Sequence, residues 1–243
     1  MIKRLFALIA VGFLAANLSA GDPWKDKPYK QWDEKDLRKI LTDSPWSKSV
    51  QIENTWAGTK PGAANPLGAS GTAASSEPKD IVRGVQPSGP PSGLTGFLIR
   101  WGSSRTVRRA LARGAILKGA QETEIEKALN LELPDYLVVI LGPDMTPFEK
   151  ASEKELQEMQ EKSYLSLKKS KARIAPSRVG LERSPDGKKI MAVYFSFPKK
   201  TPGGQPSILA DEKGAEFVCQ LGTITLKTTF DPHRMADNEG MDL

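Results

Sequence analysis

The chain has few of the residues that most often build a reactive or cross-linked site: its 243 residues include one cysteine and one histidine. With Cys219 alone, no internal disulfide can form, so the fold must be stabilised by burial of apolar side chains. With His233 alone, any histidine-based metal site or serine–histidine pair would have to be built around that residue. The two shortages exclude disulfide-rich scaffolds and argue against the common zinc and serine hydrolase centres.

Sequence motifs for catalysis and cofactor binding are missing as well. There is no Gly-x-Ser-x-Gly nucleophile motif, no phosphate-binding loop and no dinucleotide fingerprint. Ser166 and Lys169 have the spacing of a Ser-x-x-Lys pair, but they fall in an expected strand, where residues three apart point to opposite faces. Cys219 alternates with apolar neighbours in another expected strand, which indicates a core residue. We therefore expect no cofactor and identify no catalytic residue.

One group of candidate metal ligands lies near the C-terminus. Asp231, His233 and Asp237 are close in sequence, and Asp231-Pro232 is typical of the start of a short terminal helix. Two carboxylates and an imidazole could bind a metal ion. A short helix at the end of the chain holds ligands poorly in place, so a surface histidine beside a helix cap is the favoured interpretation and no metal is expected.

Long apolar runs are scarce too, and the longest lies at the N-terminus. Residues 5–16 are apolar except for one glycine and follow two basic residues, the pattern of a secretory signal peptide spanning 1–20. Cleavage is expected after Ala20 or, as the close alternative, after Gly21. The run is short for a membrane span, which disfavours an uncleaved anchor. The sequence thus predicts an exported protein, periplasmic or secreted, with no stable membrane insertion after cleavage.

Composition divides the mature chain into three stretches. Residues 21–57 form a tryptophan-rich arm, with an expected short helix over 34–41 and a strand over 50–56. Residues 58–93 are rich in Gly, Pro, Ala, Ser and Thr, which predicts a flexible linker or a long surface loop. Residues 94–243 carry helices early and alternating strands late. The expected fold class is α+β, a mainly antiparallel sheet with two or three helices on one side, onto which the arm docks.

The net charge of the chain gives little indication of a partner. The formal charge of +6 falls to +4 once Lys3 and Arg4 leave with the signal peptide. Such mild basicity does not indicate nucleic acid.

Arginines form the first candidate binding cluster. They lie at helical spacings along one side of an expected helix, and Arg100 precedes them. The four residues are Arg105, Arg108, Arg109 and Arg113. Aligned guanidinium groups could together bind an anionic polymer. In the alternative interpretation, solvent or the acids of the following segment satisfy them, and those acids are Glu122, Glu124, Glu126 and Glu132.

Tryptophans form the second candidate cluster. Trp32, Trp46 and Trp56 could offer flat apolar faces to a sugar or to a partner protein. The favoured alternative is that Trp46 and Trp56 anchor the arm on the body, with residues 50–56 joining the sheet as a strand.

Two short segments resemble a known group of proteins. Residues 43–48, Asp-Ser-Pro-Trp-Ser-Lys, and residues 100–103, Arg-Trp-Gly-Ser, are similar to segments of uncharacterised exported bacterial proteins. Those proteins combine a signal peptide, an early LTDSPW segment, a Pro/Gly-rich spacer and an RWxS strand-to-helix junction. The resemblance implies an exported α+β protein, and it carries over no catalytic or binding residue.

The sequence predicts a non-catalytic exported domain that acts by binding, with an envelope protein or an anionic polymer as candidate partner and without nucleic acid. A hydrolase whose carboxylates meet only in the folded chain is one alternative. An anionic-polymer binder that uses the arginine helix is the other.

Overall fold

The computed structural model describes residues 21–54 and 93–243. The expected signal peptide, the 58–93 linker apart from Gly93, and Trp56 lie outside the described residues. The α+β class with mainly antiparallel sheets is confirmed.

The N-terminal arm contributes short helices and one strand. These are α1 (Pro23–Asp26), the 3-10 turn η1 (Tyr29–Gln31), α2 (Glu34–Thr42) and β1 (Ser47–Glu53). Asp33 caps the start of α2: its side chain accepts the backbone N–H of Asp36, and the Asp36 carboxylate accepts the N–H of Asp33 in return. Its apolar face, Leu37, Ile40 and Leu41, is buried. The arm is therefore tied to the rest of the chain by packing as well as by β1.

The first sheet has the strand order β1-β2-β3-β7-β6, and each neighbouring pair is antiparallel. Its other strands are β2 (Leu94–Trp101), β3 (Asp135–Leu141), β6 (Arg178–Arg183) and β7 (Ile190–Pro198). The strand expected over 50–56 spans Ser47–Glu53, and it joins the sheet, as expected, by pairing with β2. The arm and the body thus form one sheet.

The second sheet has the order β5-β4-β8-β9. It comprises β4 (Tyr164–Leu167), β5 (Arg173–Ile174), β8 (Ala215–Leu221) and β9 (Ile224–Phe230). Its inner face shares an aromatic core with the first sheet: Phe195 of β7 lies 5.1 Å from Phe217 of β8, and Trp101 of β2 lies 5.2 Å from Phe230 of β9, between ring centroids. The alternation of side chains along each strand buries one face of each sheet in this core.

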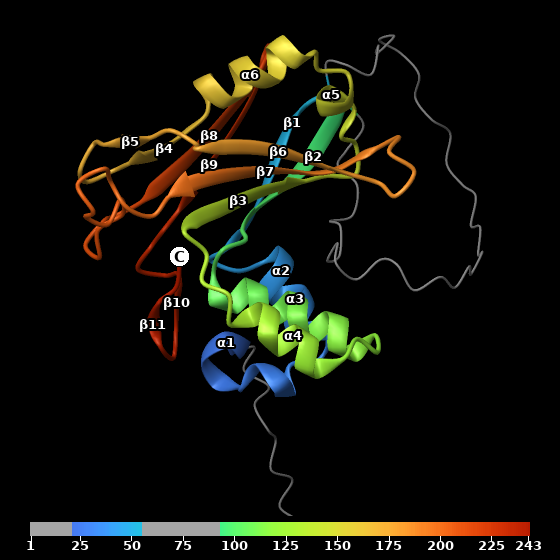
Figure 1. The fold of residues 1–243 in the computed structure, drawn as a ribbon, viewed down its shortest axis with the longest axis vertical. Helices are drawn as coiled ribbons and strands as arrows, with labels where there is room; N and C mark the ends of the chain where they lie inside the picture. Colours follow the sequence, from blue (N-terminus) through green and yellow to red (C-terminus); the bar gives the residue numbers. More distant parts are fainter. Residues whose placement is uncertain (1–20, 55–92) are drawn as a thin grey trace, which may run out of the picture.

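Helices gather at two ends of the strands (Figure 1). Helices α3 (Arg105–Leu117) and α4 (Glu122–Leu129) lie with α1 and α2 at one end, whereas α5 (Thr146–Glu149) and α6 (Glu153–Lys162) lie at the other. Ser104 caps α3 by accepting the backbone N–H of Val107 at 3.1 Å, which fixes how the chain turns from β2 into that helix.

The C-terminus differs from expectation. In place of the predicted terminal helix, residues 231–235 make a turn that leads into a two-stranded ribbon, β10 (Ala236–Asp237) and β11 (Gly240–Met241). The reason is that Met235 is fully buried in the core, while Asp237 accepts the N–H of Glu239 and so reverses the chain. In the described ranges no helix combines the length and the apolar character needed to cross a bilayer.

Candidate ligand-binding groove

The outward-facing side of the first sheet carries an apolar surface of its own. Along β3, Tyr136, Val138 and Ile140 belong to the shared core, so Leu137, Val139 and Leu141 point to the opposite face. The three outward residues are half-buried or nearly buried. An apolar stripe therefore runs along the centre of this outer face.

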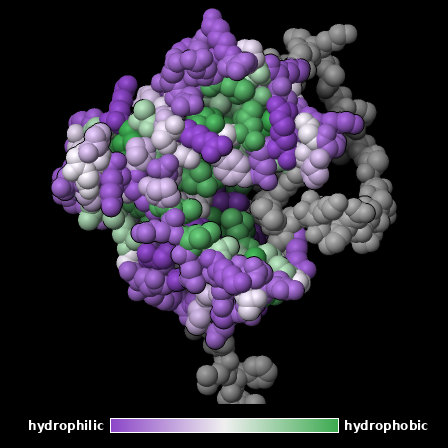
Figure 2. All heavy atoms as spheres, viewed as in Figure 1, coloured by the Kyte–Doolittle hydropathy of each residue, from purple (hydrophilic) through white to green (hydrophobic). Residues whose placement is uncertain are grey.

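This stripe forms the floor of a groove of about 800 Å³, here called the outer-face groove. Val107 and Leu111 of α3 line it at one end, and the β6–β7 hairpin with Met191 lines it at the other. Figure 2 shows a hollow with apolar surface on its walls between the strands and the helices, bordered by hydrophilic side chains. Its volume lies within the range of small-molecule sites.

Arg100 lies in the lining of the groove and is only 3% exposed. Its Nε and Nη2 donate to the carbonyl oxygen of Leu41 at 3.1 and 2.6 Å. Carbonyl groups in the last turn of a helix such as α2 lack partners within the helix, so this bond satisfies one of them. Among the residues that the structure describes, no carboxylate forms an ion pair with Arg100 and its Nη1 has no acceptor. Burial lowers the pKa of Arg100 to about 10, which leaves it charged at neutral pH.

Tyr194 faces the groove across the stripe from Arg100. Strand pairing aligns Arg100 of β2 with Val139 of β3, and Val139 with Tyr194 of β7, so the three side chains form a row across the sheet. The Tyr194 hydroxyl donates to the carboxylate of Glu182. Burial, together with this carboxylate, raises the pKa of Tyr194, so the phenol stays protonated. The groove thus has a cation on one side of its apolar floor and a hydrogen-bonded phenol on the other.

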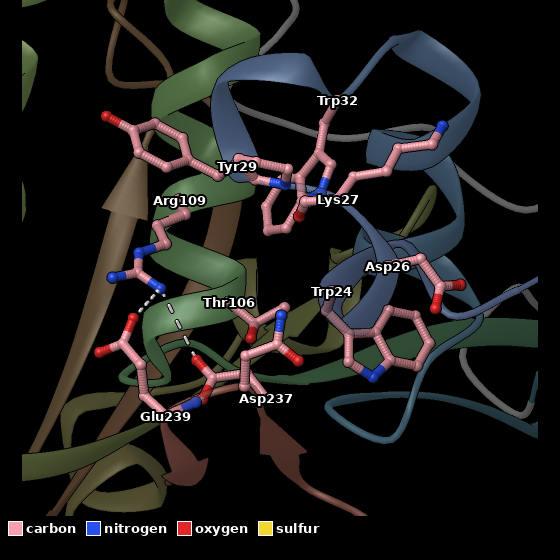
Figure 3. Close-up of a pocket in the computed structure, with 11 residues that line it drawn as sticks. Trp24, Asp26, Lys27, Tyr29, Trp32, Thr106, Arg109, Asp237 and Glu239 are labelled. Atoms are coloured by element: carbon pink, nitrogen blue, oxygen red, sulfur yellow. Dashed lines mark hydrogen bonds and ion pairs between the residues drawn. The ribbon is translucent and has the colours of Figure 1, made fainter.

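The predicted arginine cluster is partly occupied by the C-terminal ribbon. Arg105 donates to Asp237 at 2.7 Å. Arg109 lies 2.7 Å from Glu239 and 3.7 Å from Asp237, and Figure 3 shows both contacts. The side chain of Asp237 is only 4% exposed, so these are partly desolvated pairs.

The hydrolase hypothesis requires two acids that converge in a pocket. Three acids, Asp26, Asp237 and Glu239, line a cavity of about 380 Å³. Asp237 and Glu239 are engaged by the guanidinium groups of Arg105 and Arg109, which join the ribbon to α3.

The other two predicted arginines bind backbone carbonyls. Arg108 donates from Nη2 to three carbonyls, those of Ala128 and Leu129 in the last turn of α4 and that of Leu131 just beyond it. Arg113 donates from Nε to the carbonyl of Trp32 at 3.1 Å. The structure brings Arg105, Arg108 and Arg109 together around a surface cavity of about 390 Å³, and Arg113 is not among the residues that line it.

Three of the acids expected to satisfy the arginines form ion pairs with lysines. Lys30 of the arm forms ion pairs with Glu122 and Glu126, at 2.7 and 2.6 Å. Glu124 pairs with Lys127 on its own helix. The ion-pair partners of Arg105 and Arg109 are instead Asp237 and Glu239, two acids from a segment distant in sequence.

Trp46 behaves as an anchor. Its ring is fully buried, its Nε1 donates to the carbonyl of Asp242 at 2.7 Å, and its ring lies edge-on to Trp24 at 5.4 Å. It is not part of an exposed aromatic platform. Trp56, the second tryptophan of the predicted pair, lies outside the described residues.

Residues 231–237 do not assemble a metal site. In the ranges 21–54 and 93–243, no three side chains of the types His, Cys, Asp or Glu are grouped as a metal ion would require. Cys219 is buried and its thiol has a pKa raised by burial to about 12, as a core residue would have.

Sequence reasoning did not select Arg100 or Tyr194 as site residues. A signal was present for Arg100, because a charged residue within the apolar strand Phe-Leu-Ile-Arg-Trp is rare without a special partner. Tyr194 gave none, since a tyrosine is ordinary in a strand of alternating aromatic residues.

Comparison with known proteins gave no match: no protein-family model, curated protein or solved structure is significantly similar to this chain. Its function must therefore be argued from the geometry of its own residues.

Proposed function

We propose that the protein is an exported, non-catalytic binding domain and that its ligand occupies the outer-face groove. One observation carries this proposal: an apolar groove of about 800 Å³ has a buried guanidinium in its lining with N–H groups to spare. A large apolar pocket with few, well-placed polar groups is the usual form of a small-molecule site.

The polar groups of the groove suit binding better than catalysis. Arg100 keeps its proton at neutral pH, and the raised pKa of Tyr194 keeps the phenol protonated. A general acid or base works best when its pKa lies near the working pH, and neither group meets this condition. Both can instead orient a ligand through hydrogen bonds.

Export is the second part of the proposal, and residues 1–20 support it with the pattern of a signal peptide. The full-length chain should be recovered outside the cytoplasm with an N-terminus at Gly21 or Asp22, measured by fractionation and mass spectrometry. A chain that lacks residues 2–20 is the control and should stay in the cytoplasm. Recovery of the full-length chain in the cytoplasm with residues 1–20 intact would contradict export.

The groove is tested with a neutral apolar dye, Nile red, whose fluorescence rises in apolar surroundings. The purified protein should bind it, and the double variant Leu137→Phe with Leu141→Phe should bind at least about tenfold more weakly, because the added rings fill the groove floor. The matched control, Leu131→Phe with Leu209→Phe, adds the same rings at exposed positions and should leave binding unchanged. Equal binding by the groove-filling variant and the wild type would overturn the proposed site.

A further inference from the structure

Arg100 is unusual among the arginines of the described chain because it is almost fully buried without an acid partner. Arg105 and Arg109 form ion pairs, whereas Arg100 bonds only the carbonyl of Leu41. A carbonyl dipole compensates a buried charge less well than a carboxylate does. The lining of the groove therefore contains a desolvated positive charge that no carboxylate of the described residues compensates.

The charged side chains around the groove do not supply the missing acid. Glu182 accepts the Tyr194 hydroxyl, and Asp186 accepts the Ser184 hydroxyl, so both acids are engaged on the β6–β7 hairpin. The remaining charged residues of the lining, Arg183 and Lys189, are cations at its exposed edge. The lining thus carries three cations and two acids, and the excess is positive.

We infer that the outer-face groove binds a molecule with one carboxylate and an extended apolar chain, a fatty acid, with the carboxylate on Arg100 and the chain on the apolar stripe of β3. This inference rests on the proposed function, because it names the ligand class of the same groove. The carboxylate would accept hydrogen bonds from those N–H groups of the Arg100 guanidinium that do not donate to the Leu41 carbonyl. The chain would cover Leu137, Val139 and Leu141.

The charge count favours a carboxylate over other polar end groups. One buried guanidinium balances one negative charge, and its planar fork matches the two oxygens of a carboxylate. A phosphate monoester carries close to two negative charges at neutral pH. It would need more hydrogen-bond donors than the groove lining offers near Arg100. A neutral alcohol would leave the buried cation uncompensated.

The test measures how well three ligands of equal chain length displace Nile red from the wild-type protein. Dodecanoate should do so at a concentration about ten- to a hundredfold lower than dodecanol, the factor that corresponds to one charge-assisted hydrogen bond. Dodecyl phosphate should be weaker than dodecanoate. The same chain in all three ligands keeps the apolar contribution constant.

Variants of Arg100 show whether it is the group that selects the acid. Arg100→Gln should weaken dodecanoate by about ten- to a hundredfold and leave dodecanol unchanged, while Arg100→Lys should retain the preference for the acid. The matched control is the double variant Arg183→Gln with Lys189→Gln, which removes two cations at the exposed edge and should keep most of the preference, since exposed charges are screened. If Arg100→Gln does not fold, the comparison of acid and alcohol on the wild type decides alone.

The outcomes separate this inference from the proposed function. If Nile red binds but dodecanoate and dodecanol compete equally, or dodecyl phosphate competes best, the ligand class is wrong and the groove remains a binding site. If Nile red binds and none of the three displaces it, the inference is likewise overturned. If the protein binds no Nile red at all, the proposed function itself fails.

Discussion

The indole N–H of Trp46 donates to the backbone carbonyl of Asp242 at 2.7 Å, across 196 positions of sequence. The bond connects the end of the N-terminal arm to the last residues of the chain. Asp242 in turn accepts the backbone N–H groups of Arg105 and Thr106 at 2.5 and 2.8 Å through its carboxylate, at the N-terminus of α3. Asp242 therefore joins three parts of the chain: β1, α3 and the C-terminal ribbon.

Replacing Trp46 with phenylalanine tests this junction. Trp46→Phe should lower the free energy of unfolding by about 1–3 kcal/mol more than Trp101→Phe, as measured by urea denaturation. Both rings are fully buried, but within the described chain the Nε1 of Trp101 has no hydrogen-bond partner, so the difference reports the lost bond to Asp242. Equal losses in the two variants would show that ring volume, not the hydrogen bond, stabilises the junction.

Glu212 is expected to make stability depend on pH. Burial alone would raise the pKa of this carboxyl, but the N–H groups of Lys169, Ser170 and Lys213 and the hydroxyl of Ser170 outweigh burial and lower it. A carboxyl with a lowered pKa in the folded state stabilises the protein fully above its ordinary value of 4.5. That contribution is lost as the pH falls through the lowered pKa.

The variant Glu212→Gln removes this titration. It should be less stable than the wild type by about 1–3 kcal/mol at pH 7, and the difference should shrink as the pH falls below the ordinary pKa of 4.5. Urea denaturation at several pH values measures both. The control Glu132→Gln, on an exposed residue, should show neither effect. A difference that stays constant with pH would mean that Glu212 contributes by packing alone.

The ion pair between Arg105 and Asp237 should couple more strongly than an exposed pair. A double-mutant cycle with alanine at both positions should give a coupling free energy of about 1–3 kcal/mol, because the Asp237 side chain is only 4% exposed. The control cycle on Lys127 and Glu124, whose side chains are 74% and 65% exposed, should give at most about 0.5 kcal/mol. Equal coupling in the two cycles would show that Arg105 is available for an external anion.

Local patterns in the sequence predicted the elements that depend on neighbouring residues. The β-branched and aromatic runs of β3 and β7, the serine cap of α3 and the apolar face of α2 follow from residues close in sequence. The α+β class followed from the order of those elements. The terminal helix was wrongly predicted because Met235 is drawn into the core, and a local cap motif cannot foresee that contact.

The groove could not be predicted because its parts meet only through strand pairing. Arg100 and Tyr194 are 94 positions apart and become neighbours because β3 lies between β2 and β7. The partners of the arginine helix come from the C-terminal ribbon and from the ends of other elements, again at long sequence separation. Sequence periodicity identifies which side chains share a face, and strand order decides which faces meet.

Arg100 should contribute to ligand binding at the expense of stability. Its removal loses the hydrogen bonds to the Leu41 carbonyl, worth about 1.5–3 kcal/mol for a charged donor, but also removes a desolvated charge that costs several kcal/mol to bury. Arg100→Met keeps an unbranched side chain that replaces the aliphatic part of the arginine and lacks the guanidinium group. We expect its free energy of unfolding, without ligand, to be within about 1 kcal/mol of the wild type or above it.

The same variant should lose the stabilisation that a fatty acid provides. In thermal denaturation, dodecanoate at a hundredfold excess over its dissociation constant should stabilise the wild type by about 2.7 kcal/mol and Arg100→Met by much less. If the variant without ligand instead has a free energy of unfolding at least about 3 kcal/mol below that of the wild type, the main role of Arg100 is to stabilise the contact between β2 and α2. The two measurements together show whether Arg100 serves ligand binding or the stability of the fold. If it serves ligand binding, Arg100→Met does not lower the free energy of unfolding without ligand but does lose the stabilisation by dodecanoate.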